Sequence, residues 1–267
     1  YGLNKPFHMR YLKWVTNMFH GNFGRSFQWQ KPVLDLIKSR LPFTMVLVIS
    51  SMIFVYIVAI PISIYSATHQ YSIGDYFATI FGFIGLAIPN FLFALVLMFV
   101  IYKYTGLETG GLFSQAYQDA PWSMGKLLDF LTHLLPAVIV IGTAGTAGLI
   151  RTMRGTLLDE LNKLYVTVAR AKGMPRWKLI FKYPVRIALN PVISTIGWIL
   201  PALVSGGTIV SIVLNLPTMG SILYRSLMSQ DMYLAGTIVI FQTLLTFIGT
   251  FLSDMLLAWS DPRIRFE

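Results

Sequence analysis

The sequence contains no cysteine, which excludes disulfide bonds and cysteine-ligated metal sites. It is also poor in charge, because Asp, Glu, Lys and Arg make up only 12% of its 267 residues, against about 25% in a typical soluble domain. Hydrophobic residues make up 55%, and the mean hydropathy is +0.64. No soluble core could bury this much apolar surface, so the composition indicates a protein with several membrane-spanning helices.

The motifs of common enzyme classes are absent as well. The sequence has no G-x-x-x-x-G-K-[ST] phosphate loop, no H-E-x-x-H zinc motif and no G-x-S-x-G nucleophile motif. The histidines at positions 8, 20, 69 and 133 are isolated from one another, which favours structural roles over metal binding. We therefore predict that the chain is not an enzyme and binds no metal or cofactor itself.

Acidic residues are scarce, and none lies at the centre of an apolar run. Proton-coupled carriers often place a carboxylate or a histidine at mid-membrane. The candidates here are Asp254 and His133, and each lies near one end of its run. A self-contained secondary transporter or channel is thus weakly supported and stays as an alternative.

Long apolar runs predict five membrane spans, since about 20 apolar residues suffice to cross a bilayer. Pro89 lies in the middle of the second run and should kink or break it. The fourth run is too long for one crossing, and its end, with Pro217 and Gly220, reads as a partly inserted or surface segment. The predicted spans are about 41–66, 76–102, 131–150, 187–214 and 232–259.

The segment before the first span, residues 1–40, is polar and mixed. We predict short amphipathic helices in it, one of them over 33–40 at the entry to the membrane. The first carries an apolar stripe at helical spacing, which suits either the membrane interface or packing on the protein itself. That stripe consists of Tyr11, Trp14, Val15, Met18 and Phe19.

The charges of the chain lie between the apolar runs, which fits a membrane protein and argues against a nucleic-acid partner despite the net charge of +10. The loop 151–186 is the most basic stretch, and the positive-inside rule predicts that it is cytoplasmic. Its nine basic residues are Arg151, Arg154, Lys163, Arg170, Lys172, Arg176, Lys178, Lys182 and Arg186.

Counting spans from this loop predicts a cytoplasmic C-terminus and a cytoplasmic link at 67–75. Residues 1–40 and 103–130 then lie outside. The seven Lys and Arg residues of 1–40 fit that position poorly, but longer exterior segments obey the rule less strictly. An exterior start without a signal peptide leads us to expect a further membrane span before Tyr1.

Within the basic loop, an apolar stripe predicts one amphipathic helix over Thr156–Ala171 that continues span three. Gly173 is positioned to end this helix, and Pro175 prevents it from resuming at once. A second short helix is predicted over Arg176–Tyr183. The stripe consists of Leu157, Leu161, Leu164 and Val168.

We interpret the tip of this helix–turn–helix as a docking element for a soluble partner that supplies energy, because its small residues permit close approach. The alternative from spacing alone is a solvated, lipid-facing basic loop. The predicted docking residues are Val168, Ala169, Arg170, Ala171, Lys172, Gly173, Met174 and Pro175.

Span three contains the small-residue stretch 142–148, whose density of Gly, Ala and Thr favours close helix packing. A face lining a translocation pathway is the second interpretation. The candidate pathway residues are Asn90, Thr143, Thr146 and Ser205.

Ala169–Gly173 followed by Asn190-Pro-Val192 resembles the cytoplasmic loop signature of bacterial ABC-importer permeases of the dipeptide, oligopeptide and nickel family. The general signature is E-A-A with Gly four residues after its last Ala. Ala169 and Gly173 match it, while Thr167 and Val168 replace its first two residues. The downstream I-x-L-P is also absent, and these departures are typical of the peptide-permease branch.

Three further stretches resemble the same family in the same order along the chain. Residues 21–26, with Pro32-Val33, resemble the exterior segment of the first of the family's two permease subunits. Residues 87–91 resemble its third membrane helix, and 261–265 its C-terminal ending. Together the resemblance covers essentially the whole chain.

The resemblance implies an all-α, polytopic helix bundle of the type I ABC importer permease kind. Five spans would lie in this chain, with the family's first span missing. The domains would be an exterior segment at 1–40 and a transmembrane permease domain at 41–267. The latter would include the cytoplasmic coupling loop 151–186.

The resemblance also implies a multi-pass location in the bacterial plasma (inner) membrane and a set of partners. These are a second homologous permease subunit, two cytoplasmic ABC ATPase subunits that bind ATP and Mg, and an extracytoplasmic substrate-binding protein. The substrate would be a dipeptide, an oligopeptide or a nickel chelate. A membrane scaffold or insertase is a weaker alternative.

Overall fold

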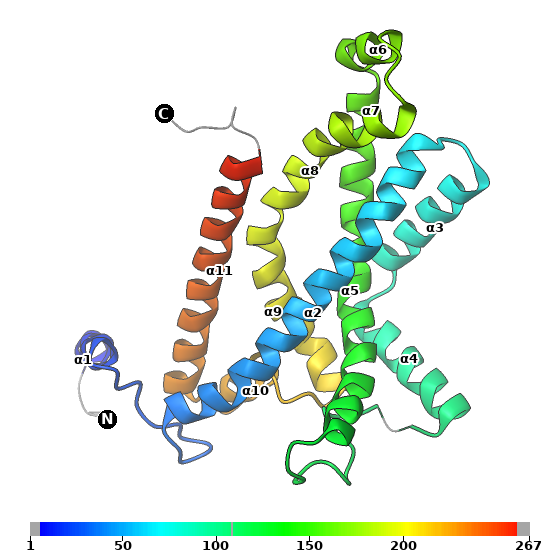
Figure 1. Ribbon diagram of the computed structural model, residues 1–267. Coiled ribbons are helices and arrows are strands. Elements are labelled where there is room, and N and C mark those ends of the chain that lie inside the picture. The colour runs from blue at the N-terminus through cyan, green and yellow to red at the C-terminus, as the bar shows by residue number, and fades with distance from the viewer. Residues whose placement is uncertain (1–5, 108, 261–267) are drawn as a thin grey trace.

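The computed structural model describes residues 6–107 and 109–260, apart from the side chains of 7, 198–206 and 260. Helices dominate this part, and its one β-contact is an isolated bridge between Arg25 and Pro32, so the predicted all-α class is confirmed. In chain order the helices (Figure 1) are α1 (Phe7–Phe19), α2 (Val33–Thr68), α3 (Ile73–Ala87), α4 (Asn90–Thr105), α5 (Met124–Leu161), α6 (Leu164–Ala171), α7 (Arg176–Lys182), α8 (Pro184–Ser194), α9 (Ile196–Val213), α10 (Met219–Met228) and α11 (Met232–Ser260).

The two longest helices, α2 and α5, pack against each other and run in the same direction. A Cβ added to Gly142 of α5 would lie 2.5 Å from Cδ1 of Phe54, and one added to Gly145 would lie 3.1 Å from Val55. The glycines therefore let α5 approach α2 closely, as expected for small residues in a membrane helix interface. Packing of the stretch 142–148 is thus visible within the single chain.

The second predicted span is divided into α3 and α4, which are bent by 106° at the break between them. Pro89 is the residue before the first turn of α4. Proline lacks a backbone donor and disfavours helix in the residue before it, and Ile88 is accordingly extended. The predicted break at Pro89 is confirmed, and Figure 1 shows α4 turning away from the line of α3.

Among the described residues, three helices are long and apolar enough to cross a membrane, namely α2, α5 and α11 over Met232–Trp259, and the α3–α4 pair qualifies together as one bent span. These four correspond to predicted spans one, three, five and two. The fourth predicted span is divided at Thr195 between α8 and α9, and it stays a prediction. Beyond it, α10 forms the short segment expected after Pro217.

Two helices extend beyond the spans predicted within them. Helix α2 begins at Val33, directly after Pro32, so the expected short helix 33–40 and span one form one continuous helix. Helix α5 begins at Met124 and continues to Leu161. Both extensions contain charged residues, and hydropathy alone detects only the apolar middle of such helices.

The segment before α2 carries α1, which lies beside α11 (Figure 1). The indole of Trp14 packs against α11, since a Cβ added to Gly236 of α11 would lie 3.0 Å from the indole ring. The rest of the predicted apolar stripe is less covered: Tyr11 is 53% and Phe19 85% exposed. Packing on the protein therefore explains part of the stripe, and its remainder is free to face the membrane interface.

Candidate functional site

Helices α6 and α7, with the turn between them, form a tip at one end of the bundle (Figure 1). Helix α6 ends in a Schellman motif, because the N–H of Gly173 donates to the carbonyl of Arg170 at 3.0 Å and that of Met174 donates to Ala169 at 3.3 Å. Gly173 has φ +76°, which favours glycine. Pro175 is then the residue before α7, so the stop expected from sequence at Gly173 is seen.

The predicted docking residues form a mixed small and basic surface on this tip. Ala169 and Met174 are half-buried, whereas the other six are exposed. A groove of about 590 Å³ runs alongside and is lined by Leu164, Val168 and Lys172, among others. Leu164 is 77% exposed within the chain, so an apolar surface is available to a partner.

The underside of the tip is buried on the rest of the bundle. Val166 of α6 and Leu179 and Ile180 of α7 are each less than 5% exposed. They belong to one hydrophobic cluster with Met153 and Leu157 of α5. The tip is therefore held against the ends of the spans and does not hang on a flexible loop.

A buried carboxylate fixes the junction between α5 and α6. Glu160 is 5% exposed and accepts hydrogen bonds from Nζ of Lys163 and the hydroxyl of Tyr165, both at 2.6 Å. Burial alone would raise the pKa of Glu160, but these two bonds outweigh it and the pKa is lowered. The pKa of the Tyr165 hydroxyl is raised by burial and by the same carboxylate.

This junction corrects one prediction. The expected single helix over Thr156–Ala171 is interrupted, because Asn162 ends α5 and Lys163 is extended before α6 begins. The predicted apolar stripe is split accordingly. Leu157 is fully buried under the bundle, whereas Leu164 and Val168 are exposed.

A second buried carboxylate ties the tip end of α5 to α2 and α3. Asp75, 3% exposed, receives two hydrogen bonds from Arg154, Nε to Oδ1 at 3.0 Å and Nη2 to Oδ2 at 2.9 Å. The hydroxyl of Ser66 donates to the same carboxylate, and so does the N–H of Tyr71, at 2.9 Å. We call Ser66, Asp75 and Arg154 the Asp75 cluster.

The pKa of Asp75 follows from these contacts. Burial of the carboxylate raises the pKa. The hydrogen bonds from Arg154, Ser66 and Tyr71 and the charge of Arg154 lower the pKa by more than burial raises it. The net pKa lies below the ordinary value, so the carboxylate is ionised at neutral pH and makes a charge-assisted bidentate pair.

Helix α7 has its own link to the same region. Nη2 of Arg176 donates to the backbone carbonyl of Thr68, the last residue of α2, at 3.1 Å. The Asp75 cluster and this bond connect the tip and its root to α2 and α3. A displacement of the tip would therefore be transmitted to both spans.

The sequence reasoning missed the Asp75 cluster and Glu160. Asp75 and Arg154 are 79 positions apart, and no spacing rule relates them. One signal was available: Asp75 is the one acidic residue between Arg40 and Lys103. A lone acid at the end of an apolar run invites a search for a basic partner.

The candidate pathway residues come from three helices, α4, α5 and α9. Thr143 lies where α5 meets α3, since a Cβ on Gly85 would be 3.2 Å from its methyl carbon. Thr146 is 8% exposed, and its hydroxyl has no hydrogen-bond partner among the described residues. Asn90 begins α4 and is half-buried. Ser205 belongs to α9, in the stretch whose side chains lie outside the described residues.

The described residues contain no group of three or more His, Asp or Glu side chains that could hold a metal ion. The C-terminal motif at 261–265 lies outside the described residues.

The glycine-rich motif at 21–26 lies within the described residues, and its last residue, Ser26, bonds to the segment before α11. The hydroxyl of Ser26 donates to buried Asp231, which also accepts from the N–H of Leu234 at the start of α11, at 3.3 Å.

Comparisons with known proteins agree with this architecture. Residues 59–266 match the family model for the binding-protein-dependent transport system inner membrane component. The oligopeptide transport system permease protein AppB of Bacillus subtilis (strain 168) is 37% identical over 100% of this chain and 83% of its own length. The inner membrane ABC transporter permease protein YejB of Escherichia coli O157:H7 is 34% identical over 100% of this chain and 74% of its own length.

The dipeptide transport system permease protein DppB of Escherichia coli (strain K12) is 27% identical over 100% of this chain and 83% of its own length. Among solved structures, a chain of the MetNI methionine ABC transporter in an inward-facing conformation matches with a TM-score of 0.63. It covers 85% of this chain and 96% of its own, at 15% identity. That match concerns the fold.

Proposed function

The chain belongs to the family of binding-protein-dependent transport system inner membrane components, and we propose that it forms half of the translocation pathway of an ATP-driven peptide importer. It would be the first of the two homologous permease subunits. The observation that carries the mechanism is the rigid, exposed tip formed by α6 and α7. A family of permeases that do not hydrolyse ATP themselves needs such a joint to an ATPase.

In the proposed mechanism, residues 168–175 dock into a groove on a cytoplasmic ABC ATPase subunit. ATP and Mg bind in the two ATPase subunits and not in this chain. When those subunits close on ATP, the docked tip moves, and the Asp75 cluster and the Arg176 bond pass this motion to α2 and α3. The spans then alternate between outward and inward access.

We propose five crossings in this chain, made by α2, the bent α3–α4 pair, α5, α8 with α9, and α11. The tip and the C-terminus would be cytoplasmic, as the basic loop 151–186 suggests. The protein would be a multi-pass component of the bacterial inner membrane. A self-contained secondary transporter or channel is the alternative. It is less consistent with the tip, because such a protein needs no exposed docking surface for an ATPase.

Peptides are the proposed substrate, because relatives that match the whole chain are named as oligopeptide and dipeptide permeases. An extracytoplasmic binding protein would deliver the peptide. A nickel chelate is the second candidate, and its only support is the resemblance of the loop and exterior motifs to a family that includes nickel permeases.

The docking role is tested with Ala171→Trp, a bulky residue on the exposed end of α6. Ile73→Trp is the control, because Ile73 is also exposed at this end of the bundle but lies on α3. We expect Ala171→Trp to reduce co-purification of the ATPase subunits about tenfold, as for a residue at the centre of an interface. The control should leave it unchanged.

Equal co-purification in both variants would contradict the docking role. The complete function is tested by reconstituting this chain with its second permease, ATPases and binding protein in vesicles. We expect peptide uptake that requires ATP and is blocked by vanadate. Uptake by this chain alone would instead support a self-contained carrier.

A further inference from the structure

A cavity of about 1140 Å³ lies at the end of the bundle opposite the tip. It is lined by the N-terminal parts of α2 and α5, residues 106–107 and 110–118 of the loop after α4, the end of α9, and α10. In the proposed topology it opens to the outside, where a binding protein would release its cargo. We call it the distal cavity.

Two arginines line the distal cavity, Arg40 from α2 and Arg225 from α10. They come from helices that contact each other, so two like charges line one cavity. Among the described residues neither forms an ion pair, since the paired carboxylates belong to Asp75, Asp129 and Glu160. Two like charges without a counter-ion among the described residues make a local positive potential that attracts anions.

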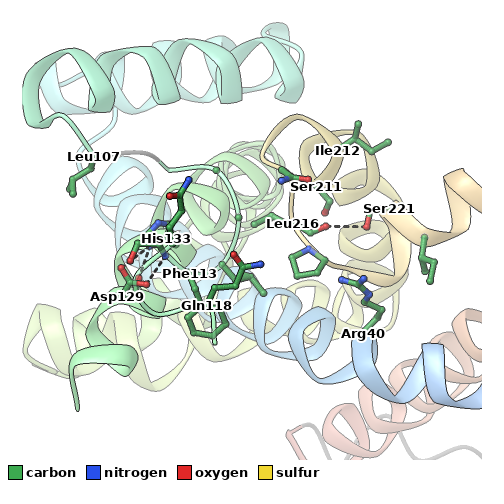
Figure 2. A pocket seen from close by; sticks show the side chains of 18 of the residues that line it. Arg40, Leu107, Phe113, Gln118, Asp129, His133, Ser211, Ile212, Leu216 and Ser221 are labelled. Atoms are coloured by element: carbon green, nitrogen blue, oxygen red, sulfur yellow. Dashed lines mark hydrogen bonds and ion pairs between the residues drawn. The ribbon is translucent and has the colours of Figure 1, made fainter. Parts of the chain in front are cut away.

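The opposite side of the distal cavity carries negative charge. Figure 2 shows Asp129 and His133 on one side and Arg40 on the other. Asp129 is already engaged there, because its Oδ2 accepts the N–H of Ser114 at 2.8 Å and its Oδ1 lies 3.6 Å from Nδ1 of His133. It therefore does not neutralise the arginines, and the cavity keeps separated charges of both signs.

We propose that Arg40 and Arg225 form a site for the free carboxylate of a peptide entering the distal cavity. A guanidinium pair suits a carboxylate because each fork of donors matches its two oxygens. The two guanidinium groups attract a carboxylate, so an entering peptide would be oriented with its carboxyl end toward the arginines. This inference rests on the proposed peptide transport.

The absence of cysteine in this chain allows a direct test by thiol labelling. Gln118 is an exposed residue of the distal cavity and lies between its two sides in Figure 2. In the full complex, the Gln118→Cys reporter is labelled by an anionic and by a cationic methanethiosulfonate. The ratio of the two rates, read by mass spectrometry, reports the local potential.

We expect Arg40→Gln and Arg225→Gln each to lower the anionic-to-cationic ratio about tenfold. Lys38→Gln is the matched control, because Lys38 is an exposed cation of α2 that does not line the distal cavity. It should change the ratio little. Tri-alanine should slow labelling of the reporter, tri-alanine amide should not, and Arg40→Gln should abolish the difference.

An unchanged ratio in both arginine variants would overturn the anion site. Equal protection by tri-alanine and its amide would overturn the recognition of a carboxylate. A charge-dependent ratio without any protection would overturn the peptide and point to an acidic surface of a binding protein.

Labelling does not require transport, so the two proposals fail separately. A complex that imports peptide but has a charge-independent ratio overturns only the carboxylate site. A complex without ATP-driven peptide uptake, in which tri-alanine gives no protection, overturns both.

Discussion

At the scale of single residues, the Asp75 cluster ties the end of α5 that leads into the tip to α2 and α3. Arg154 is 27% exposed while the side chain of Asp75 is 5% exposed. Removing the arginine would leave a buried carboxylate without its main partner, and such a change is strongly destabilising. Removing the charge of Asp75 at the same time would relieve most of that penalty.

We therefore predict that Arg154→Met destabilises the complex by about 3 kcal/mol, and that Arg154→Met with Asp75→Asn recovers part of this loss. Arg151→Met is the control, because Arg151 is an exposed arginine one turn earlier on α5. Thermal unfolding of the purified complex measures all three. Equal midpoints for Arg154→Met and Arg151→Met would contradict the role given to the cluster.

The depressed pKa of Asp75 gives this contribution a pH dependence. The carboxylate titrates below its ordinary value of 3.8 in the folded protein, so the unfolded chain binds the proton more readily. The stabilisation is therefore complete above that value and is lost as the pH falls through the folded pKa. Glu160, whose pKa is also lowered, acts in the same direction.

We predict that the gap in unfolding midpoint between the wild type and Asp75→Asn is constant from neutral pH down to about 4 and narrows under more acidic conditions. Taking the difference between the two proteins removes the contribution of other carboxylates. A gap that widens with acidification would have the wrong sign for a lowered pKa.

At the scale of helices, the end of α6 depends on backbone conformation and not on space. Gly173 has φ +76°, and a Cβ there would meet nothing within 4 Å. A side chain at this position therefore costs about 1–2 kcal/mol of backbone strain without a steric clash. The strain would disturb the turn that presents Ala171 and Lys172.

We predict that Gly173→Leu leaves membrane insertion intact but lowers peptide uptake relative to ATP hydrolysis. Gly155→Leu is the matched control, because Gly155 also has nothing within 4 Å but lies inside α5, where any residue fits the backbone. Uptake and ATPase activity are measured on the same vesicles. Normal coupling in Gly173→Leu would argue that the tip tolerates a different turn.

The elements that sequence predicted well are those with local causes. Pro89 breaks the second span because of its own ring, and Gly173 ends α6 because of its own conformational freedom. The interruption at Lys163 was not predictable in this way. It depends on Glu160, whose hydrogen bonds with Lys163 and Tyr165 stabilise the extended conformation of Lys163 between two helices.

The residues of the candidate site also divide into those with local causes, which sequence can predict, and those that only the fold brings together. The docking residues 168–175 are consecutive, so their grouping required no knowledge of the fold. The Asp75 cluster and the two arginines of the distal cavity join residues far apart in sequence, and they become neighbours through the packing of α2 against α5 and α10. Such pairs carry no period or spacing that a single sequence displays.

At the scale of the whole molecule, the family predicted from four short motifs is confirmed by a match over residues 59–266 and by relatives aligned to the entire chain. The structure shows in addition that two candidate functional regions lie at opposite ends of the long axis of the bundle. The basic tip lies at one end and the distal cavity at the other, with α2 and α5 running between them (Figure 1). Energy would enter at the first end and peptide at the second.

The orientation of this axis in the membrane is a prediction from charge, and it can be tested directly, again because the chain has no cysteine. Lys178→Cys on α7 and Gln115→Cys in the distal cavity are both at exposed positions outside the predicted spans. The nine basic residues of 151–186 predict, by the positive-inside rule, that α7 is cytoplasmic. We predict that a membrane-impermeant maleimide labels Gln115→Cys in intact spheroplasts and labels Lys178→Cys only after the membrane is opened. The opposite labelling pattern would contradict the predicted topology, because the tip would then lie outside the cell, away from a cytoplasmic ATPase.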